Sequence, residues 1–375
     1  MENKPDFKRL KEYNYKLASD ALSSGRPFLK SMPVDINIQT TLKCNLRCIM
    51  CQRETVPREN LTGNMPLSLF KRIAQESFPF ADNVSFTVIG EPLLTDNIFE
   101  MLDILKEYQV GLELVTNANL LDNDKLILKM LDLLNVISVS LDAASKETYE
   151  AIRRGGDFEK VISNLRRFSQ LRKKTKNDCL FSISFLGMER NIRELPRVID
   201  LAKDIGAQQV NLSDLLVFRE EMKEESLMYH KEMEARYISE AIDVALRSGI
   251  NLTLPPAQTD FFKYNFSYLF EKLIATLHGI KNKILFYNLP SNKRCRYLWA
   301  KVYIDERANV YPCCAPRKPL MGNLYEQTLK EIWNNSLYLK MREGFLTEKP
   351  FDCCQDCNLN PIKFNVVEEK KFIKI

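Results

Sequence analysis

The chain has 375 residues, 45% of them hydrophobic and 27% charged, which suits about two folded domains and excludes a disordered or low-complexity protein. Its 54 Lys and Arg against 49 Asp and Glu leave a net charge of +5, too little to indicate a nucleic-acid partner. Only two histidines occur, His230 and His278, which disfavours a His-rich zinc hydrolase, whereas ten cysteines stand out.

Residues 1–30 form a basic segment that we expect to be a partly helical N-terminal arm. The arm lacks the apolar stretch of a secretory signal, and no run approaches the 18 or so apolar residues of a membrane span. We therefore expect a cytoplasmic protein without membrane association. In that compartment thiols stay reduced, so clustered cysteines indicate metal ligands rather than disulfides.

From residue 33 onward, short β-type runs alternate with amphipathic helical stretches. Strands are predicted at 34–38, 84–88, 112–116, 136–141, 180–185, 209–212 and 251–254, and helices near 67–77, 97–109, 123–134, 146–172, 192–204 and 231–248. Strands separated by such helices imply βαβ units and a parallel sheet. The predicted fold class is α/β, a partial (β/α)6 barrel of the TIM type over residues 31–254, with its site at the carboxyl ends of the strands.

The pattern changes after residue 254. Residues 255–294 are rich in aromatics and are predicted to be a helical linker, with a substrate wall or an apolar docking surface as the alternative. Residues 295–361 are predicted to be a small Cys-rich α+β domain, with a hairpin of 301–304 and 309–311, a helix over 329–342, and a tail from 362 to 375.

The first cysteine cluster directly follows the first predicted strand. Cys44, Cys48 and Cys51 are separated by three and two residues, so three thiolates share one tight loop. Thiolates are the usual ligands of a 4Fe-4S cube, and three of them leave one iron without a protein ligand. Zinc fits less well, because a closed structural zinc site needs a fourth ligand and the nearest His is distant in sequence.

This CxxxCxxC loop resembles the radical S-adenosylmethionine (SAM) superfamily, and further motifs carry the resemblance through residue 254. Gly90-Glu91-Pro92 is similar to the Gly-Gly-Glu-Pro loop that holds the SAM amino group, with Ile89 in place of the first Gly. Thr116-Asn117-Ala118 resembles the family's Thr-Asn-Gly. The resemblance implies SAM contacts from the residues Gly90, Glu91, Pro92, Asn117, Ser140, Asp142 and Arg153, although Arg154 remains an alternative to Arg153.

A second set of six cysteines lies in the last third of the chain. Its members are Cys295, Cys313, Cys314, Cys353, Cys354 and Cys357. Four of them could close a 4Fe-4S or a zinc site. The surrounding segments resemble the SPASM and twitch auxiliary-cluster modules of the same superfamily. The resemblance implies two clusters and at least seven cysteines for a full SPASM module, so these six, with two adjacent pairs, predict one auxiliary 4Fe-4S cluster and hence two clusters in the chain. We predict its ligands to be Cys295, Cys313, Cys354 and Cys357, with Cys314 and Cys353 as substitutes.

The remaining chemistry-bearing residues have plainer explanations. We expect Cys179 to be a buried core thiol and both histidines to be structural or exposed. Asn191 and Glu194 recur in the family after the fifth strand, but a helix cap explains Asn191 equally well.

The resemblance implies reductive cleavage of SAM to a 5′-deoxyadenosyl radical, with a flavodoxin- or ferredoxin-type electron donor. The expected function is dehydrogenation of a small alcohol or aminosugar, with the auxiliary cluster as electron acceptor. A maturase acting on a peptide or protein side chain is the alternative, but about 30 residues before the barrel leave no room for the leader-binding domain that many maturases carry. A non-catalytic Fe-S or zinc scaffold is disfavoured, because a scaffold needs no SAM pocket.

Overall fold

The computed structural model describes residues 5–86, 89–255, 294–313, 318–355 and 357, together with the short strand β10 (Leu285–Phe286). The predicted aromatic linker, the C-terminal tail, His278 and Cys314 lie outside the described residues. None of the helices in the described part of the chain combines the length and apolar character needed to cross a membrane.

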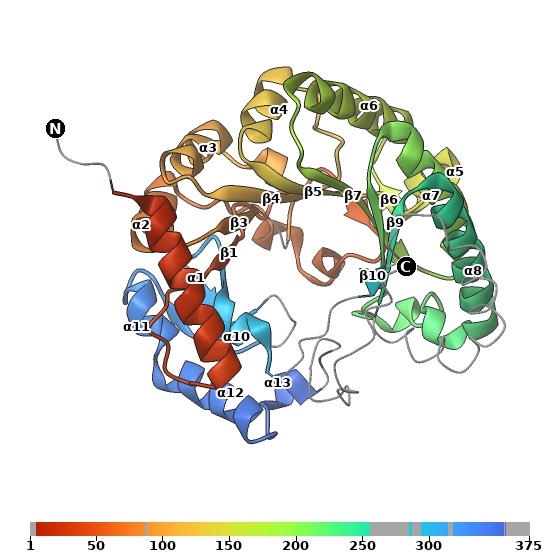
Figure 1. The fold of residues 1–375 in the computed structure, drawn as a ribbon. Helices are drawn as coiled ribbons and strands as arrows, with labels where there is room; N and C mark the ends of the chain where they lie inside the picture. Colours follow the sequence, from red (N-terminus) through yellow and green to blue (C-terminus); the bar gives the residue numbers. More distant parts are fainter. Residues whose placement is uncertain are drawn as a thin grey trace.

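The central feature is a curved parallel sheet with helices along its outer side (Figure 1). Every predicted strand is present, and six βα units run in chain order, so the partial (β/α)6 barrel is confirmed. The units comprise β1 (Asp35–Ile38), α2 (Leu67–Ser77), β3 (Asn83–Phe86), α3 (Ile98–Glu107), β4 (Gly111–Thr116), α4 (Asp124–Leu131), β5 (Leu134–Ser140), α5 (Lys146–Ile152), α6 (Phe158–Thr175), β7 (Leu180–Gly187), α7 (Leu195–Ile205), β8 (Gln209–Asp214) and α8 (Lys231–Ser248), followed by β9 (Asn251–Leu254).

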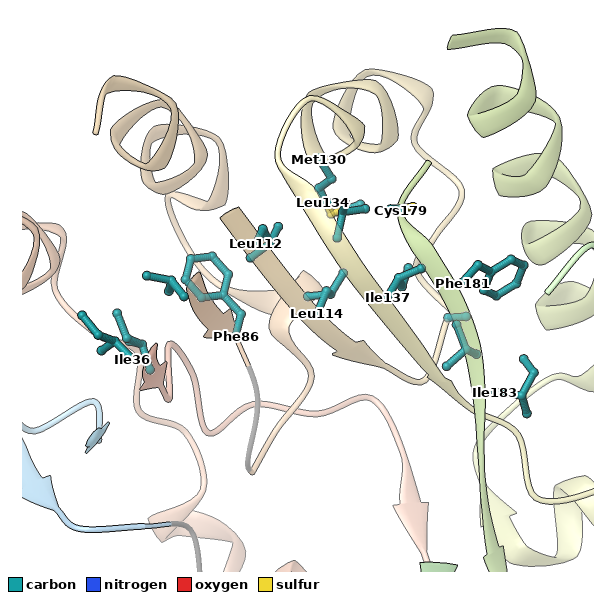
Figure 2. Close-up of a cluster of buried hydrophobic side chains, with 14 of the residues drawn as sticks. Ile36, Phe86, Leu112, Leu114, Met130, Leu134, Ile137, Cys179, Phe181 and Ile183 are labelled. Carbon is teal, nitrogen blue, oxygen red and sulfur yellow. The ribbon is translucent and has the colours of Figure 1, made fainter. Parts of the chain in front are cut away.

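The hydrophobic core lies between the sheet and these helices. Alternate strand residues point to opposite faces, and those that face the helices are apolar and buried, among them Leu112, Leu114, Ile137, Phe181 and Ile183 (Figure 2). Cys179 belongs to the same core with 2% of its surface exposed, as the sequence predicts. Burying each large aliphatic or aromatic side chain contributes roughly 1.5–3 kcal/mol.

The predicted helix over 146–172 is in fact interrupted. α5 ends at Ile152, and residues 153–157 cross over before α6 begins. Gly155 adopts a φ of +87°, a conformation that glycine allows and other residues rarely take, so the chain can leave the helix here. The interruption creates a short strand, β6 (Arg153–Arg154), which pairs antiparallel with β2 (Arg47–Cys48).

The C-terminal segment joins the same sheet. The predicted hairpin forms as β11 (Lys301–Ile304) and β12 (Asn309–Tyr311), and β11 pairs parallel with β1. β13 (Gly322–Asn323) continues the sheet, and α10 (Arg296–Ala300) packs on the N-terminal helix α1 (Phe7–Ser24) (Figure 1). The Cys-rich segment is therefore an extension of the barrel sheet, whereas the sequence indicated a hairpin of its own.

The predicted helix over 329–342 is also divided. α11 (Leu329–Trp333) and α12 (Ser336–Leu346) are separate because Asn335 begins a new helix, its side chain accepting from the backbone N–H groups of Leu337 and Tyr338. A last short helix, α13 (Asp352–Gln355), carries Cys353 and Cys354.

Candidate active site

The loop that carries Cys44, Cys48 and Cys51 leaves the carboxyl end of β1, as the sequence predicts. Within the loop, the Leu46 N–H donates to Cys44 Sγ at 3.4 Å and the Cys51 N–H donates to the Cys48 carbonyl at 3.0 Å. These local bonds turn the backbone tightly enough to keep all three cysteines on one side of the sheet edge.

A second connection ties this loop to the segment after α5. β2 pairs with β6, so that Cys48 lies opposite Arg153, and the Ile49 N–H donates to the Ile152 carbonyl at 2.9 Å. The pairing decides between the two arginines. Arg153 points inward and is 8% exposed, whereas Arg154 is exposed.

Arg153 links the cysteine loop to the end of β5. Its Nη1 lies 3.7 Å from Cys48 Sγ, and its Nη2 lies 2.6 Å from Asp142 Oδ2 in a largely buried ion pair. Asp142 also accepts from the Leu186 N–H at 2.8 Å. Burial raises the pKa of Asp142, and the positive charge of Arg153 opposes that rise. Burial alone would lower the pKa of Arg153, but the negative charges of Asp142 and Cys48 outweigh it, so the pKa of Arg153 is raised. Asp142 thus contacts protein groups on both sides and orients the guanidinium.

Glu91 holds the next two loops together. Its carboxylate is 2% exposed and accepts from the Thr116 hydroxyl at 2.6 Å, the Asn117 N–H at 2.8 Å and the Leu93 N–H at 3.2 Å. Burial raises its pKa, while these hydrogen bonds lower it. The Glu91 N–H donates to the Lys43 carbonyl at 2.8 Å, which connects this network to the cysteine loop.

Glycine is required at position 90. Gly90 has a φ of +96°, and a Cβ there would lie 2.5 Å from the Thr41 carbonyl oxygen. Two residues later, Pro92 is the first residue of the short helix η3 (Pro92–Leu94). Proline suits this position because the first N–H group of a helix has no partner within the helix. The Gly90-Glu91-Pro92 motif therefore positions the loop of β3 directly against the residues that precede Cys44.

Asn117 lies on the other side of the cysteine loop. Its side-chain amide donates to Asn45 Oδ1 at 2.9 Å and lies 3.9 Å from Cys44 Sγ. The next residue, Ala118, has a φ of +58°, which explains why the related motif carries glycine there. Ser140, the last residue of β5, is partly exposed on the inner face of the sheet.

Two residues at the end of β7 support this arrangement from below. Glu194 accepts from the N–H groups of Ala144 and Ser145 and from two hydroxyls at the start of α5, which lowers its pKa even though burial opposes this. Asn191 donates to the carbonyls of Asp142 and Leu186 and accepts from the Met188 N–H. Asn191 thus ties β5 to β7 and makes no side-chain bond to the helix that follows, so the cap explanation is wrong.

Sequence reasoning missed Arg53, two residues beyond Cys51. Its Nη1 is buried and has no hydrogen-bond partner among the described residues, and the guanidinium acts to lower the pKa of the Cys44 thiol. Burying an unpaired cation is costly. The only available signal was a charged residue directly after a metal-binding loop, which is common on solvated loops as well.

The donor chemistry of this site fits an iron–sulfur cluster. Burial raises the pKa of Cys44. Burial also raises the pKa of Cys48 to about 12, although the positive charge of Arg153 opposes that rise. The thiols raise one another's pKa as well, which indicates that they lie close together. No three His, Cys, Asp or Glu side chains in the described ranges are close enough to share a single metal ion. In a cube each thiolate binds a different iron, so the sulfurs need not approach one another that closely.

The second cysteine set comes from three separate segments. Cys295 precedes α10, Cys313 follows β12, and Cys354 and Cys357 lie in and just after α13. Burial raises the pKa of Cys354, and the nearby thiols of Cys353, Cys295 and Cys313 raise it further. Burial raises the pKa of Cys295 to about 11, and the Cys357 thiol adds to that rise. The fold therefore brings all four predicted ligands into one neighbourhood.

Two other candidate residues from the sequence analysis, Cys353 and His230, lie at the following positions. Cys353 lies 3.9 Å from Cys354, sulfur to sulfur, and packs against the core. Neither thiol is in a disulfide. His230 is half-buried just before α8, where its Nε2 contacts the Glu224 carbonyl, far in sequence from either cysteine set.

Two segments of the chain match models of known protein families. Residues 38–202 match the radical SAM superfamily, and residues 295–358 match SPASM, an iron–sulfur cluster-binding domain. The chain belongs to the radical SAM superfamily and carries a C-terminal SPASM-type domain. Its cofactors are accordingly SAM and 4Fe-4S clusters.

Individual relatives differ in name. A probable GTP 3′,8-cyclase of Methanocaldococcus jannaschii is 32% identical over 190 residues, which cover 50% of this chain and 61% of the relative, so the match spans less than two thirds of that protein. The AdoMet-dependent heme synthase of Methanosarcina barkeri is 26% identical over 333 residues, covering 81% and 83%. Among solved structures, Streptococcus suis SuiB bound to its precursor peptide SuiA has a TM-score of 0.62 at 16% identity, covering 93% of this chain and 74% of SuiB, which shows a common fold.

Proposed function

We propose that this chain is a radical SAM enzyme that reductively cleaves SAM and takes a hydrogen atom from its substrate. The observation that carries the proposal is the position of Cys48, 3.7 Å from Arg153, which is itself held by the buried Asp142 at 2.6 Å. This arrangement puts a fixed cation beside the three-thiolate loop, where an anionic carboxylate of SAM has to bind.

Cys44, Cys48 and Cys51 are the proposed ligands of the SAM-binding cluster. When bound, the reduced cluster supplies the electron that splits SAM into methionine and a 5′-deoxyadenosyl radical. Arg153 pairs with the SAM carboxylate through its guanidinium fork, and Asp142 acts as a positioning residue for that arginine. The backbone of Gly90, Glu91 and Pro92 receives the amino group, and Asn117 and Ser140 line the remaining edge.

The second cluster is proposed to have Cys295, Cys313, Cys354 and Cys357 as ligands, and it makes the enzyme an oxidoreductase. The substrate is a small alcohol or aminosugar that loses one hydrogen atom to the radical, then one proton and one electron. When bound, the second cluster would accept that electron. A flavodoxin- or ferredoxin-type protein supplies the electron for SAM cleavage.

A peptide substrate is the second candidate function. Leu216, Val217 and Phe218, which follow β8 at the carboxyl edge of the sheet, are 48%, 40% and 36% exposed. Three consecutive exposed apolar side chains beside a site suit an extended peptide. SuiB, which shares the fold, is bound to its precursor peptide.

The deciding experiment uses the full chain after anaerobic reconstitution. Iron and sulfide are measured first, and 5′-deoxyadenosine is then quantified after addition of dithionite and SAM. We expect about eight irons per chain, since each 4Fe-4S cluster carries four, together with 5′-deoxyadenosine. Iron-loaded protein that forms none would overturn the proposal.

A further inference from the structure

The two faces of the barrel sheet have opposite chemistry. Residues of β4, β5, β7 and β8 that face the helices are mostly apolar and buried, whereas most of their inward-facing neighbours, Ser182 excepted, remain partly exposed. Val115, for example, is 38% exposed although β4 is a central strand. In a filled TIM-type barrel the inward layer is dominated by bulky branched apolar side chains. Here many of the inward positions carry a hydroxyl, an amide or a carboxylate, among them Glu113, Ser138, Ser182, Ser184, Asn211 and Thr253.

The strand register lines these polar residues up. Ser138 pairs with Ser182, Ser184 pairs with Asn211, and Asn211 pairs with Thr253 on adjacent strands. Neighbouring parallel strands lie about 4.8 Å apart, so these side chains form a continuous polar surface across β5, β7, β8 and β9. The surface lies directly below the carboxyl edge that carries the cysteine loop.

Several of these groups have hydrogen-bonding capacity to spare. The hydroxyls of Ser138 and Ser184 make no hydrogen bond to any described residue, and Thr253 Oγ1 is buried with no partner. Asn211 accepts from Gln209 Nε2 at 2.6 Å, which leaves its own amide N–H groups available. Leaving a buried polar group unpaired costs roughly 1–3 kcal/mol. A ligand with several hydroxyls would satisfy these groups together.

The charge of this inner surface indicates which charge its ligand carries. Of the inward-facing positions on β4, β5, β7, β8 and β9 that the structure describes, Glu113 is the one charged residue, and none is Lys, Arg or His. Glu113 Oε2 accepts from the Ser85 hydroxyl at 2.7 Å. A carboxylate without a nearby cation repels the triphosphate of GTP and attracts an ammonium group.

We propose, on the basis of the function proposed above, that this inner face binds an aminosugar or aminocyclitol. Its hydroxyls contact Ser138, Ser184, Asn211 and Thr253, and its ammonium group pairs with Glu113. A carbinol C–H bond of the ligand breaks, and the hydrogen atom forms 5′-deoxyadenosine. The O–H proton then passes to water and the remaining electron to the oxidised auxiliary cluster, so that the carbinol becomes a ketone.

The test compares ligands on the reconstituted full chain. Glucosamine, streptamine, GTP and an uncharged peptide are each added with SAM and dithionite, and 5′-deoxyadenosine is measured against a sample without additive. We expect glucosamine or streptamine to raise its formation at least tenfold, with deuterium transferred from the deuterated compound. Stimulation by GTP or the peptide alone overturns the assignment of this surface, and so does stimulation by none of the four when the sample without additive already forms 5′-deoxyadenosine.

Binding is measured separately by equilibrium dialysis without reductant, so that the site can be judged even if SAM is not cleaved. Glu113→Gln should weaken glucosamine binding about tenfold but change myo-inositol binding less than twofold, because only glucosamine carries the ammonium. Ser184→Ala should weaken both about fivefold. The control Ser163→Ala, on the exposed side of α6, should change the binding of neither compound.

Equal effects of Glu113→Gln on both compounds, or no effect on either, would contradict the proposal. Absence of 5′-deoxyadenosine despite normal binding overturns the proposed function alone.

Discussion

The two cysteine sets are built in different ways. Cys44, Cys48 and Cys51 lie within a single loop of eight residues, and short-range bonds such as Leu46 N–H to Cys44 Sγ shape it. Cys295, Cys313 and the pair Cys354 and Cys357 come from segments separated by helices and a hairpin. The first set is specified locally, whereas the second exists only after the C-terminal segment has folded onto β1.

The two sets also differ in their polar surroundings. Arg153, Asp142, Glu91 and Asn117 bond to one another or to the first loop from three neighbouring strand ends. In the second set, Cys295, Cys353 and Cys354 pack against the hydrophobic core. A site with a polar shell can orient a charged ligand, whereas an apolar pocket with four thiolates suits a closed cluster whose task is electron transfer.

The largest expected effect comes from removing a ligand of the first set. Cys48→Ala should reduce 5′-deoxyadenosine formation more than about 1000-fold, because the step depends entirely on the cofactor. Iron content should fall to about four per chain, since the second cluster stays. Iron analysis with a chromatographic assay checks both. Retained cleavage at normal iron content would refute the assignment of the loop.

The next effect concerns the ion pair beside that loop. Asp142→Ala leaves Arg153 buried without its partner, which should cost roughly 3–5 kcal/mol of unfolding free energy. Denaturant titration of the apoprotein measures the loss. As a matched control, Asp132→Ala removes an exposed partner of Lys106 and should change stability by less than about 1 kcal/mol. Similar losses in both variants would mean that the buried pair has no special role.

A smaller loss is expected at the backbone that holds the first loop. Gly90→Ala forces a Cβ to within 2.5 Å of the Thr41 carbonyl at a φ of +96°. The resulting strain should cost about 1–3 kcal/mol and loosen SAM binding. Gly155→Ala, at a φ of +87° where the nearest atom to a Cβ would be the Asn45 carbonyl oxygen at 3.4 Å, serves as the control for the backbone effect alone. The difference between the two isolates the close approach.

The smallest effect on SAM cleavage should come from the second set. Cys354→Ala is expected to change 5′-deoxyadenosine formation less than about threefold while substrate turnover falls about tenfold or more, since only the later electron transfer is affected. Both products are measured in the same reaction. Equal loss of both activities would make the C-terminal cysteines structural, and the comparison between the two sets would no longer hold.

Much of the fold followed from periodicity. The strands, the six βα units and the hairpin of β11 and β12 were predicted because alternation and turn residues are local signals. The breaks at residues 153–157 and at Asn335 were missed, since the amphipathic pattern continues through both and only the pairing of β2 with β6 or a new helix cap reveals them. Boundaries of the predicted domains stay predictions.

The sequence by itself determined the class of the protein, because the spacing of Cys44, Cys48 and Cys51 and the motifs after each strand are local features. Only the tertiary structure decided that Arg153 rather than Arg154 points inward, that Asp142 holds it, and that Nη1 of the half-buried Arg53 has no hydrogen-bond partner among the described residues. The polar inner face also needed the structure, since it depends on the register of five strands. Contacts between segments far apart in the chain leave no pattern in a single sequence, and these are the contacts that shape the site.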